Sequence, residues 1–356
     1  MRYPLALTGW SAVSPLGLGA RAFSEGMRDG HSGVRDYDEP EPAGMSRVAT
    51  VPAFDIREVL GPKNTRSMDR ATALAVATVG KLLEGRAEGD GRDIGLVLGT
   101  TTGSVQSMMD FTRDSLTEDK PFLVDPARFP NTVMNCAAGQ CAIWHGLYGP
   151  NTTVAGGQAT GLTALNYAAR LQQSGHAETV LCGAVEEFSA QRAWLERRAR
   201  AGDETVPVLG EGCAVFLLES VRAARLAGRP VLAELLAVDL RVYDADPRGG
   251  LADSVRAGLA AARVSTDEVW AVAGDEASAA TLDELFAPAL SRRIGVEQAL
   301  GDTGAAAAAM RLAAVLAAAE HDPDADGRAA VVTSVDRDGL LGCAVLRLTG
   351  APEPRP

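Results

Sequence analysis

Side chains that could carry out covalent chemistry are few in this sequence and lie far apart. It contains five cysteines and four histidines, but it has no Cys-x-x-Cys pair and no cysteine–histidine cluster that would supply the four ligands of a zinc site. A Gly-x-Ser-x-Gly elbow, which marks many serine hydrolases, is also missing. We therefore expect no bound metal, and we expect the cysteines to be small buried hydrophobic residues of a reduced compartment. They are Cys136, Cys141, Cys182, Cys213 and Cys343.

Composition and charge are those of a globular protein with an acidic surface. Hydrophobic residues make up 46% and charged residues 22% of the chain, and the formal net charge is −12. An acidic surface repels phosphate backbones, so we expect no nucleic-acid partner. The longest apolar runs, 312–319 and 331–335, are far shorter than the roughly 20 residues of a membrane span. The N-terminus shows no signal-peptide pattern, and we expect a cytoplasmic protein without a membrane contact.

Short apolar runs bounded by Gly, Asp or Pro predict buried β-strands, and helical patterns lie between them. The predicted strands are 5–8, 94–98, 152–154, 179–182, 213–218, 269–272, 330–333 and 343–348. The clearest helical patterns, with Ala and Leu at three- and four-residue spacing, are 71–83, 162–173, 253–262 and 305–319. This alternation predicts an α/β protein with mostly parallel sheets covered by helices.

The order of helices and strands occurs twice along the chain. Helix–strand units begin near Ala71 and Gly161 in the first half and near Asp253 and Ala305 in the second half. Each unit consists of a helical pattern followed by a short apolar strand. Two copies of one scheme predict a duplicated domain.

Four ordered motifs resemble the β-ketoacyl synthase family. Residues 7–17, Leu-Thr-Gly-Trp-Ser-Ala-Val-Ser-Pro-Leu-Gly, are similar to the family's first strand and turn. Residues 67–70, Ser-Met-Asp-Arg before an Ala-rich helix, are similar to a second sequence motif of this family. Residues 138–151, Ala-Gly-Gln-Cys-Ala-Ile-Trp-His-Gly-Leu-Tyr-Gly-Pro-Asn, resemble the loop, strand and turn that lead to the catalytic elbow. Residues 209–214, with Gly-Glu-Gly, resemble a strand entry, and the last third of the chain matches the family only in outline.

The resemblance implies a thiolase-type fold. Its two similar α/β halves, here residues 1–222 and 223–356, form one intimate unit. Each half has a sheet sandwiched between helices, and the halves share a central helical layer, which gives a layered αβαβα architecture. The resemblance also implies a dimer built edge to edge through the strand near Thr152–Val154.

Active ketosynthases use one cysteine and two histidines, and the resemblance places all three positions in this sequence. The cysteine thiolate takes the acyl chain, and the histidines promote decarboxylation of the malonyl extender and stabilise the enolate and oxyanion. The nucleophile's position holds Gln158, whose amide cannot carry a thioester. The histidine positions hold Asp275 and Asp302. Carboxylates would repel the developing negative charge, so we expect no catalytic residue in this chain.

None of the four histidines in the sequence is expected to take over the role of the two catalytic histidines. His31 lies in a polar loop, and His176 and His321 follow predicted helix ends, where a cation complements the helix dipole. His145 falls within the matched motif, and we predict a structural role for it. The glycine-rich loop near the family's C-terminus is also degenerate, since residues 336–342 are Asp-Arg-Asp-Gly-Leu-Leu-Gly.

Two kinds of ketosynthase relative carry a glutamine at the elbow. Chain-length factors are inactive subunits of type II polyketide synthases that pair with a Cys-His-His ketosynthase and help to shape its acyl tunnel. Loading decarboxylases keep both histidines, which this chain lacks. The resemblance therefore implies a chain-length factor, which is part of an enzyme only as a subunit of the condensing heterodimer. A malonyl decarboxylase and a non-enzymatic homodimeric binding protein are the alternatives, and aromatic polyketides and reduced polyenes are both compatible products.

The resemblance also implies what the chain contacts. Its partner is an active ketosynthase, and the acyl carrier protein, which brings phosphopantetheine, should contact mainly that partner because this chain is acidic. We expect no cofactor bound to this chain itself. Gln158 either fills the former catalytic cavity or assists decarboxylation through its amide. Candidates for lining the tunnel lie in the helix after Gly103 and in the loop that crosses the interface; they are Met109, Phe111, Thr112, Leu116 and Met134.

Overall fold

The computed structural model describes residues 4–37, 44–84, 93–200, 206–286 and 292–349. One long sheet has the strand order β12-β11-β13-β14-β10-β1-β9-β7-β5-β6, and the short strand β2 (Gly17–Leu18) pairs with β1. A second sheet contains β3 (Arg35–Asp36), β4 (Arg47–Ala49) and β8 (Leu209–Gly210). Within the described ranges, no helix is long and apolar enough to cross a membrane.

Each half of the long sheet contains five strands in the same arrangement. The first half consists of β1 (Leu5–Ser14), β9 (Gly212–Ser220), β7 (Thr179–Glu186), β5 (Ile94–Thr100) and β6 (Asn151–Ala155). The second consists of β10 (Ala233–Val242), β14 (Leu340–Leu348), β13 (Ala329–Val335), β11 (Val269–Ala273) and β12 (Arg292–Ile294). In this order both halves have two antiparallel pairings followed by two parallel ones. The shared pattern confirms the predicted duplication.

The two halves join where β1 pairs with β10. Residues 5–7 lie opposite residues 233–235 in antiparallel register. Because the strand order is the same on either side of this contact, an approximate twofold axis passes between β1 and β10. The first strand of each half thus lies at the centre of the molecule.

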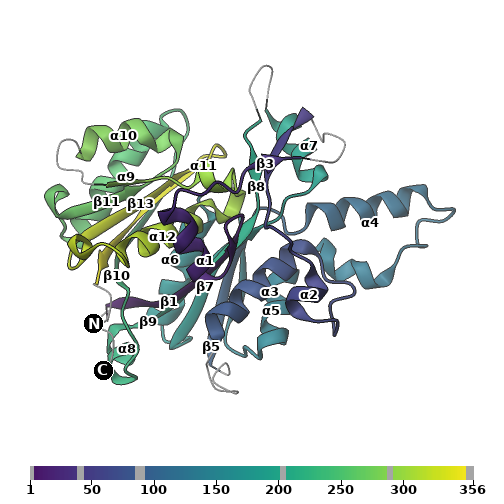
Figure 1. Cartoon of the computed structure of the whole chain (residues 1–356), viewed down its shortest axis with the longest axis horizontal. Helices are drawn as coiled ribbons and strands as arrows, with labels where there is room; N and C mark the ends of the chain where they lie inside the picture. The colour runs from purple at the N-terminus through teal and green to yellow at the C-terminus, as the bar shows by residue number, and fades with distance from the viewer. Residues whose placement is uncertain (1–3, 38–43, 85–92, 201–205, 287–291, 350–356) are drawn as a thin grey trace.

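Helices form three layers around the two halves of the sheet (Figure 1). The central layer consists of α6 (Thr160–Gln173) and α12 (Ala307–Ala319), whose buried residues share one apolar cluster with strands of both halves. The first half is covered on its outer face by α3 (Arg70–Leu83) and α5 (Cys136–His145). The second half is covered by α9 (Pro247–Ala262) and α10 (Glu276–Phe286). The result is the five-layered αβαβα architecture of the thiolase fold.

Small residues let the two central helices approach each other closely. The residues of α12 are almost all Ala, Leu, Val or Met, and 11 of its residues are buried, as expected for a helix that is covered on every side. A Cβ added to Gly161 of α6 would lie only 2.6 Å from the backbone N of Ala309. The spacing of the central layer therefore depends on the missing side chain at position 161.

The remaining helices lie between these layers or at the surface. They are α1 (Ala20–Arg28), α2 (Ile56–Leu60), α7 (Ala190–Ala199), α8 (Val221–Leu226), α11 (Glu297–Leu300) and the 3-10 turns η3 (Thr266–Glu268), η4 (Gly304–Ala306) and η5 (Pro323–Ala325). The predicted boundary between the halves, at residues 222 and 223, falls within α8 and stays a prediction.

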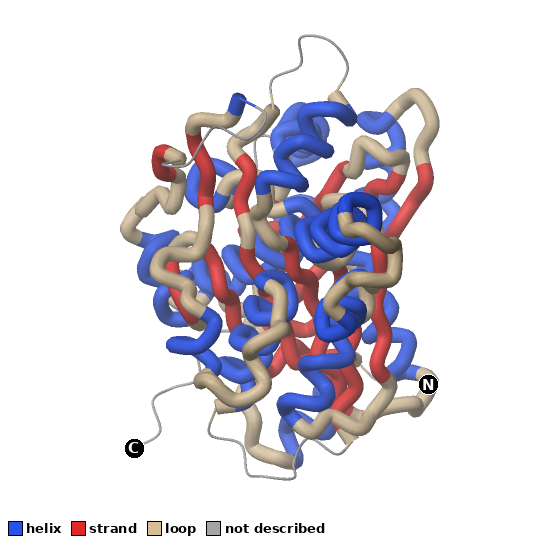
Figure 2. Tube along the Cα trace, turned by 90° about the vertical axis from the view of Figure 1, so that its right-hand side faces the viewer, coloured by secondary structure: helices blue, strands red, loops and turns tan. Residues whose placement is uncertain are grey.

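One part of the chain extends away from the layered body. It is formed by α4 (Val105–Thr117) and η2 (Pro126–Thr132), and we call it the arm. Figure 1 shows the arm at the right, and Figure 2 views the molecule from that side. On α4 only Val105 is buried. The arm lies in the same half as β6, which is the last strand of the sheet.

The predicted strands and helices all lie within observed elements, but two predictions are wrong. The long sheet is not mostly parallel, because its central strands, from β13 through β14, β10, β1 and β9 to β7, pair antiparallel and only the two ends are parallel. The second wrong prediction concerns one of the motifs. The segment that resembles a loop and strand before the elbow forms α5, and the strand begins only at Asn151. Its apolar run packs on α3 through Ala137, Ala138 and Cys141, which are spaced for one helical face. The missed elements include β10, where charged residues interrupt the apolar pattern.

The contact at Gly161 leads to a prediction about stability. We expect Gly161→Ala to lower the free energy of unfolding by about 1–3 kcal/mol, because the added methyl group must push α12 away. Gly139→Ala on α5 is the control, since a Cβ there meets nothing within 4 Å. Replacing this helical glycine by alanine should raise the free energy of unfolding by about 0.5–1 kcal/mol. Urea denaturation of both variants measures the difference, and equal stability would contradict the close approach.

Candidate functional site

The turn between β6 and α6 is the elbow at which the sequence places Gln158. Neither glycine before it has room for a side chain. A Cβ on Gly156 would lie 2.8 Å from Thr160 Oγ1, and one on Gly157 would lie 1.9 Å from Asp336 Oδ2. Gln158 is half-buried, and α6 begins two residues after it. The elbow therefore presents this side chain at the N-terminal end of a central helix.

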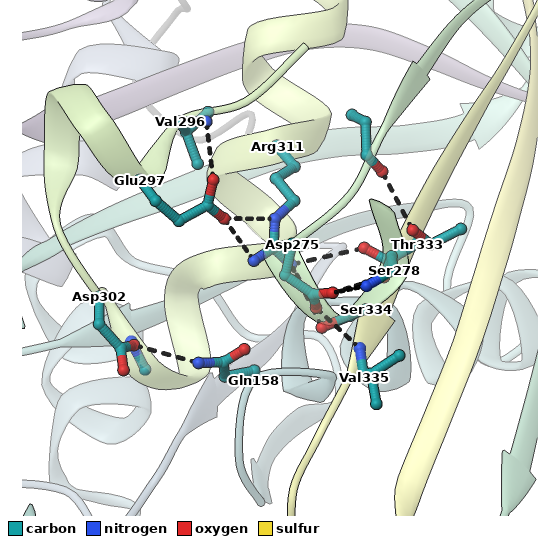
Figure 3. Close-up of polar contacts among 12 residues, drawn as sticks. Gln158, Asp275, Ser278, Val296, Glu297, Asp302, Arg311, Thr333, Ser334 and Val335 are labelled. Atoms are coloured by element: carbon teal, nitrogen blue, oxygen red, sulfur yellow. Dashed lines mark hydrogen bonds and ion pairs between the residues drawn. The ribbon is translucent and has the colours of Figure 1, made fainter. Parts of the chain in front are cut away.

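The Gln158 amide contacts Asp302, which occupies the second predicted histidine position (Figure 3). Nε2 of Gln158 donates a hydrogen bond of 3.4 Å to Oδ1 of Asp302. The same oxygen accepts from the backbone N–H of Gly304 at 2.9 Å, and Oδ2 lies 4.0 Å from Nη2 of Arg200. The structure thus brings two of the three predicted positions together.

A buried arginine fixes the backbone of Asp302. Arg192 is 5% exposed, and its Nη2 donates to the carbonyl oxygen of Asp302 at 3.0 Å. The same carbonyl accepts from Gly210 N–H at 2.9 Å, and Asp302 N–H donates to the Val208 carbonyl at 2.7 Å. Three hydrogen bonds therefore hold the turn that points the carboxylate toward the elbow.

Asp275, at the first predicted histidine position, belongs to a different set of contacts. Its Oδ1 accepts from the backbone N–H and the hydroxyl of Ser278, in the first turn of α10. Its Oδ2 accepts from Val335 N–H at 2.9 Å and lies 3.5 Å from Nη1 of Arg311. The carboxylate is 8% exposed. Four partners satisfy it, so Asp275 connects the start of α10 with the end of β13.

Arg311 is the hub of this second network (Figure 3). Its side chain is 1% exposed, on the central helix α12. Nε and Nη2 both donate to Oε1 of Glu297, at 2.9 and 2.5 Å, and Nη1 lies 3.3 Å from the hydroxyl oxygen of Ser334. Two carboxylates thus neutralise one buried guanidinium. Removing one member of such a group is costly because it leaves a buried charge without its partner.

The sequence analysis missed both Arg311 and Glu297. A signal for Arg311 exists, since it is the one charged residue in the run 307–319. A charged side chain in an otherwise apolar helix must find a buried partner. Its partners could not be named from the sequence, because Asp275 and Glu297 come from other elements.

The three predicted positions hold an amide and two carboxylates. A neutral amide is neither a nucleophile nor a general base. Asp302 lies beside Arg200, and Asp275 lies beside Arg311, so both carboxylates are partners of cations. In the part of the chain that the structure describes, no group of three or more His, Cys, Asp or Glu residues could hold a metal ion.

The tunnel candidates lie on and beside the arm. Met109, Phe111, Thr112 and Leu116 are on α4, and Leu116 is 79% exposed. The Phe111 ring lies 5.9 Å from that of Phe129 in η2. Met134 follows η2, and a Cβ added to Gly103, just before α4, would lie 2.9 Å from the Cα of Met134. The structure therefore gathers all five candidates in one region, and their role in a tunnel stays a prediction.

Burial shifts the pKa values of the thiols and of His145, the histidine in the third motif. Burial lowers the pKa of His145, whose Nε2 lies 2.9 Å from the carbonyl oxygen of Val76, so this residue connects α5 to α3. Burial also raises the pKa of Cys182 and Cys213 to about 12. The prediction of buried cysteines is confirmed for four of the five, and Cys136 is half-buried; the four are Cys141, Cys182, Cys213 and Cys343.

Comparison with known proteins decides the family. The model of the β-ketoacyl synthase N-terminal domain matches residues 3–224, which is more than half of the chain. The chain belongs to the β-ketoacyl synthase family. Among curated relatives, the 3-oxoacyl-[acyl-carrier-protein] synthase 2 of Vibrio harveyi is 26% identical over 255 residues, which cover 65% of this chain and 61% of that protein. This ketosynthase-family chain thus spans less than two thirds of that relative's length.

Solved structures share the fold over almost the whole chain. "The ishigamide ketosynthase/chain length factor" is 47% identical, with a TM-score of 0.92 and coverage of 98% of this chain and 100% of that chain. "AntDE:AntF (apo): type II PKS acyl-carrier protein in complex with its ketosynthase bound to the hexaketide" is 19% identical, with a TM-score of 0.82 and the same coverage. The second likeness supports the fold alone, whereas the first also shows close sequence similarity.

The buried network predicts a large loss of stability when Arg311 is removed. We expect Arg311→Met to lower the free energy of unfolding by about 3–5 kcal/mol, because the buried carboxylate of Asp275 would lose its cation. The control is Arg256→Met, which removes an exposed arginine 3.2 Å from Asp253 in the same half. That change should cost less than about 0.5 kcal/mol. Chemical denaturation compares the two, and similar losses would show that the buried arginine has no special role.

Proposed function

We propose that this chain is a chain-length factor. It is the non-catalytic subunit that pairs with an active ketosynthase to form the condensing heterodimer of a type II polyketide synthase. The observation that carries the proposal is Gln158 at the elbow, hydrogen-bonded to Asp302 where a ketosynthase is expected to have Cys and His. The similarity to "The ishigamide ketosynthase/chain length factor" over 98% of the chain supports it.

The chemistry of the elbow supports a role without covalent catalysis. The N-terminal end of a helix favours a negative charge, which suits a thiolate nucleophile. The amide of Gln158 offers no such charge and forms no thioester with an acyl group. Asp302 places negative charge beside the elbow, where an enolate or oxyanion would need a hydrogen-bond donor, and Asp275 is engaged in a separate buried network. Loading, decarboxylation and condensation would therefore depend on the partner's Cys-His-His residues.

The partner would contact the edge strand β6 and the arm. β6 ends the sheet, so one row of its backbone groups faces no strand among the described residues. Large apolar side chains are exposed on the arm and around it, which is typical of an interaction surface. They are Leu116, Phe122, Leu123, Phe129, Val133, Met134, Ile143 and Tyr148. Burying a surface of this kind is typical of obligate dimers.

The arm would set product length by entering the partner's acyl tunnel. Side-chain volume on α4 would limit how far the polyketide or polyene chain can extend, since overfilling a packed space costs on the order of 1–3 kcal/mol. No cofactor would bind to this chain. Phosphopantetheine would arrive on an acyl carrier protein that docks mainly on the partner, because this chain carries a net charge of −12. Its location in the cytoplasm stays a prediction.

The first test separates the chain from its partner. The purified chain, alone and co-purified with a ketosynthase, is incubated with malonyl-loaded acyl carrier protein, and released CO₂ and elongated acyl species are measured. We expect the chain alone to be inert and the pair to elongate. Release of CO₂ by the chain alone would favour the decarboxylase instead, and a stable homodimer that never pairs would favour a binding protein.

The second test concerns product length. We expect Leu116→Ala and Met109→Ala, each paired with the same ketosynthase, to give products longer by at least one malonyl-derived unit, because a smaller side chain leaves more room in the tunnel. Val242→Ala is the control, since Val242 is an apolar residue, 85% exposed, in the other half of the chain. Mass spectrometry of the acyl species measures the lengths of the products. Unchanged lengths would remove both residues from the tunnel.

A further inference from the structure

The most deeply buried contact between α4 and the body is at the first turn of this helix. α4 has 13 residues and is therefore about 20 Å long. Val105, at its first position, is its one buried residue. Further along, α4 contacts η2 of the arm and α7 of the body. The contacts around Ser104 and Val105 thus set, together with α7, the direction in which this helix leaves the body.

One carboxylate receives the start of α4. Glu187 follows β7 directly and is 2% exposed. Its Oε1 accepts a hydrogen bond of 2.9 Å from the hydroxyl of Ser104 and one of 3.3 Å from the backbone N–H of Gln106. Ser104 is the N-cap of α4, and its Oγ accepts in turn from Ser107 N–H. Glu187 therefore binds both the cap and the first turn of the arm.

The other oxygen of the same carboxylate holds a helix of the body. Oε2 of Glu187 accepts from the backbone N–H of Ala71 at 3.3 Å, in the first turn of α3. The first nine residues of α3 after Arg70 are all buried, so α3 is a rigid reference. A single buried side chain thus connects the N-terminal turns of two helices, one in the core and one in the arm.

Charged groups surround Glu187 on several sides. Asp69, the N-cap of α3, and Glu186 on β7 are acidic, whereas Arg70 on α3 is basic. Arg192 of α7 donates to the Glu187 carbonyl oxygen at 3.1 Å, and the first turn of α4 carries no acidic residue. Burial, reinforced by the charge of Asp69, raises the pKa of Glu187 to about 8. The Glu187 carboxyl, which connects α3 and α4, is therefore protonated at neutral pH.

We propose that Glu187 is the positioning residue of the arm: its two oxygens fix the direction of α4 relative to α3, and so the depth at which the arm reaches the partner's acyl tunnel. The last clause rests on the proposed function. A rotation of about 10° at the first turn moves the far end of a 20 Å helix by about 3.5 Å. Small changes at Glu187 thus become large displacements at Leu116.

The test measures hydrogen exchange of the first turn of α4 in the purified chain. Glu187→Ala removes both acceptors, and we expect the protection factors of residues 107–110 to fall at least tenfold. Glu219→Ala is the matched control, because Glu219 is a fully buried carboxylate at the opposite end of the β7–β9 pair. It should leave the protection of α4 unchanged. Equal protection of α4 in wild type and Glu187→Ala would overturn the proposal.

The dependence on pH distinguishes positioning from a general loss of packing. The pKa of Glu187 in the closed arm lies above its ordinary value of 4.5. Docking of α4 on Glu187 is therefore coupled to the binding of a proton. The free energy that holds α4 on the body falls as the pH rises toward 8 and changes no further above it. In wild type the protection factors of residues 107–110 should fall by up to about tenfold per pH unit between pH 6 and 8. Glu187→Gln keeps an oxygen for α4 but cannot titrate, so its factors should be constant; a slope that persists in this variant would refute the role of Glu187.

Product length separates this inference from the proposed function. In the pair with a ketosynthase, Glu187→Ala should broaden the product distribution, and Glu219→Ala should not. Unchanged α4 protection rejects Glu187 as the positioning residue, whatever the products are. Reduced protection of α4 with an unchanged product distribution leaves the anchoring in place and removes the arm from the acyl tunnel, so that the part of the proposed function that assigns product length to the arm fails instead.

Discussion

The close packing of α6 against α12 is the constraint on which the other features depend. Both helices are covered by sheet on two sides, so their facing positions must be small, and Gly161 lies against the backbone of Ala309. The duplicated halves place the N-terminal ends of these helices beside each other. The turns before them carry Gln158 and Asp302, respectively. The contact at the elbow is therefore a consequence of how the two halves pack.

The two aspartates at the predicted histidine positions have different surroundings. Asp302 lies at the elbow, beside Gln158 and Arg200. Asp275 is buried, and Arg311 and Ser278 satisfy its oxygens. A side chain that exchanges protons with a substrate needs freedom from such partners, whereas a buried ion pair needs them all. The contacts of Asp275 are those of a buried ion pair.

The fold could be predicted from the sequence where the signals are local. Buried strands such as β13 are continuous apolar runs, and α12 is an almost pure apolar helix. β10 was missed because its half-buried residues mix apolar and charged types. The resemblance predicts a loop, a strand and a turn for residues 138–151, whereas α5 extends to His145. A short apolar run fits a strand and a helix equally well. The resemblance, rather than periodicity, supplied the positions of Gln158, Asp275 and Asp302.

The polar networks could not be predicted from the sequence because their members are distant in the chain. Glu187 contacts residues 83 and 116 positions away, at Ser104 and Ala71. Asp275, Glu297 and Arg311 likewise come from separate elements, although the isolated charge in α12 hinted at a buried partner. Each carboxylate could have paired with any of several arginines. Only the packing of the layers selects one.

The two ends of the long sheet differ in a way that controls how large an assembly can become. β6 is a neutral edge of Asn, Thr, Val and Ala. β12, its counterpart in the other half, is three residues long, and its first two residues are Arg292, which pairs with Asp322, and Arg293, which pairs with Asp283. Charges on a short edge oppose the addition of a further strand. Pairing through β6 alone would join two chains and then stop, whereas a sheet open at both ends could extend into a fibre.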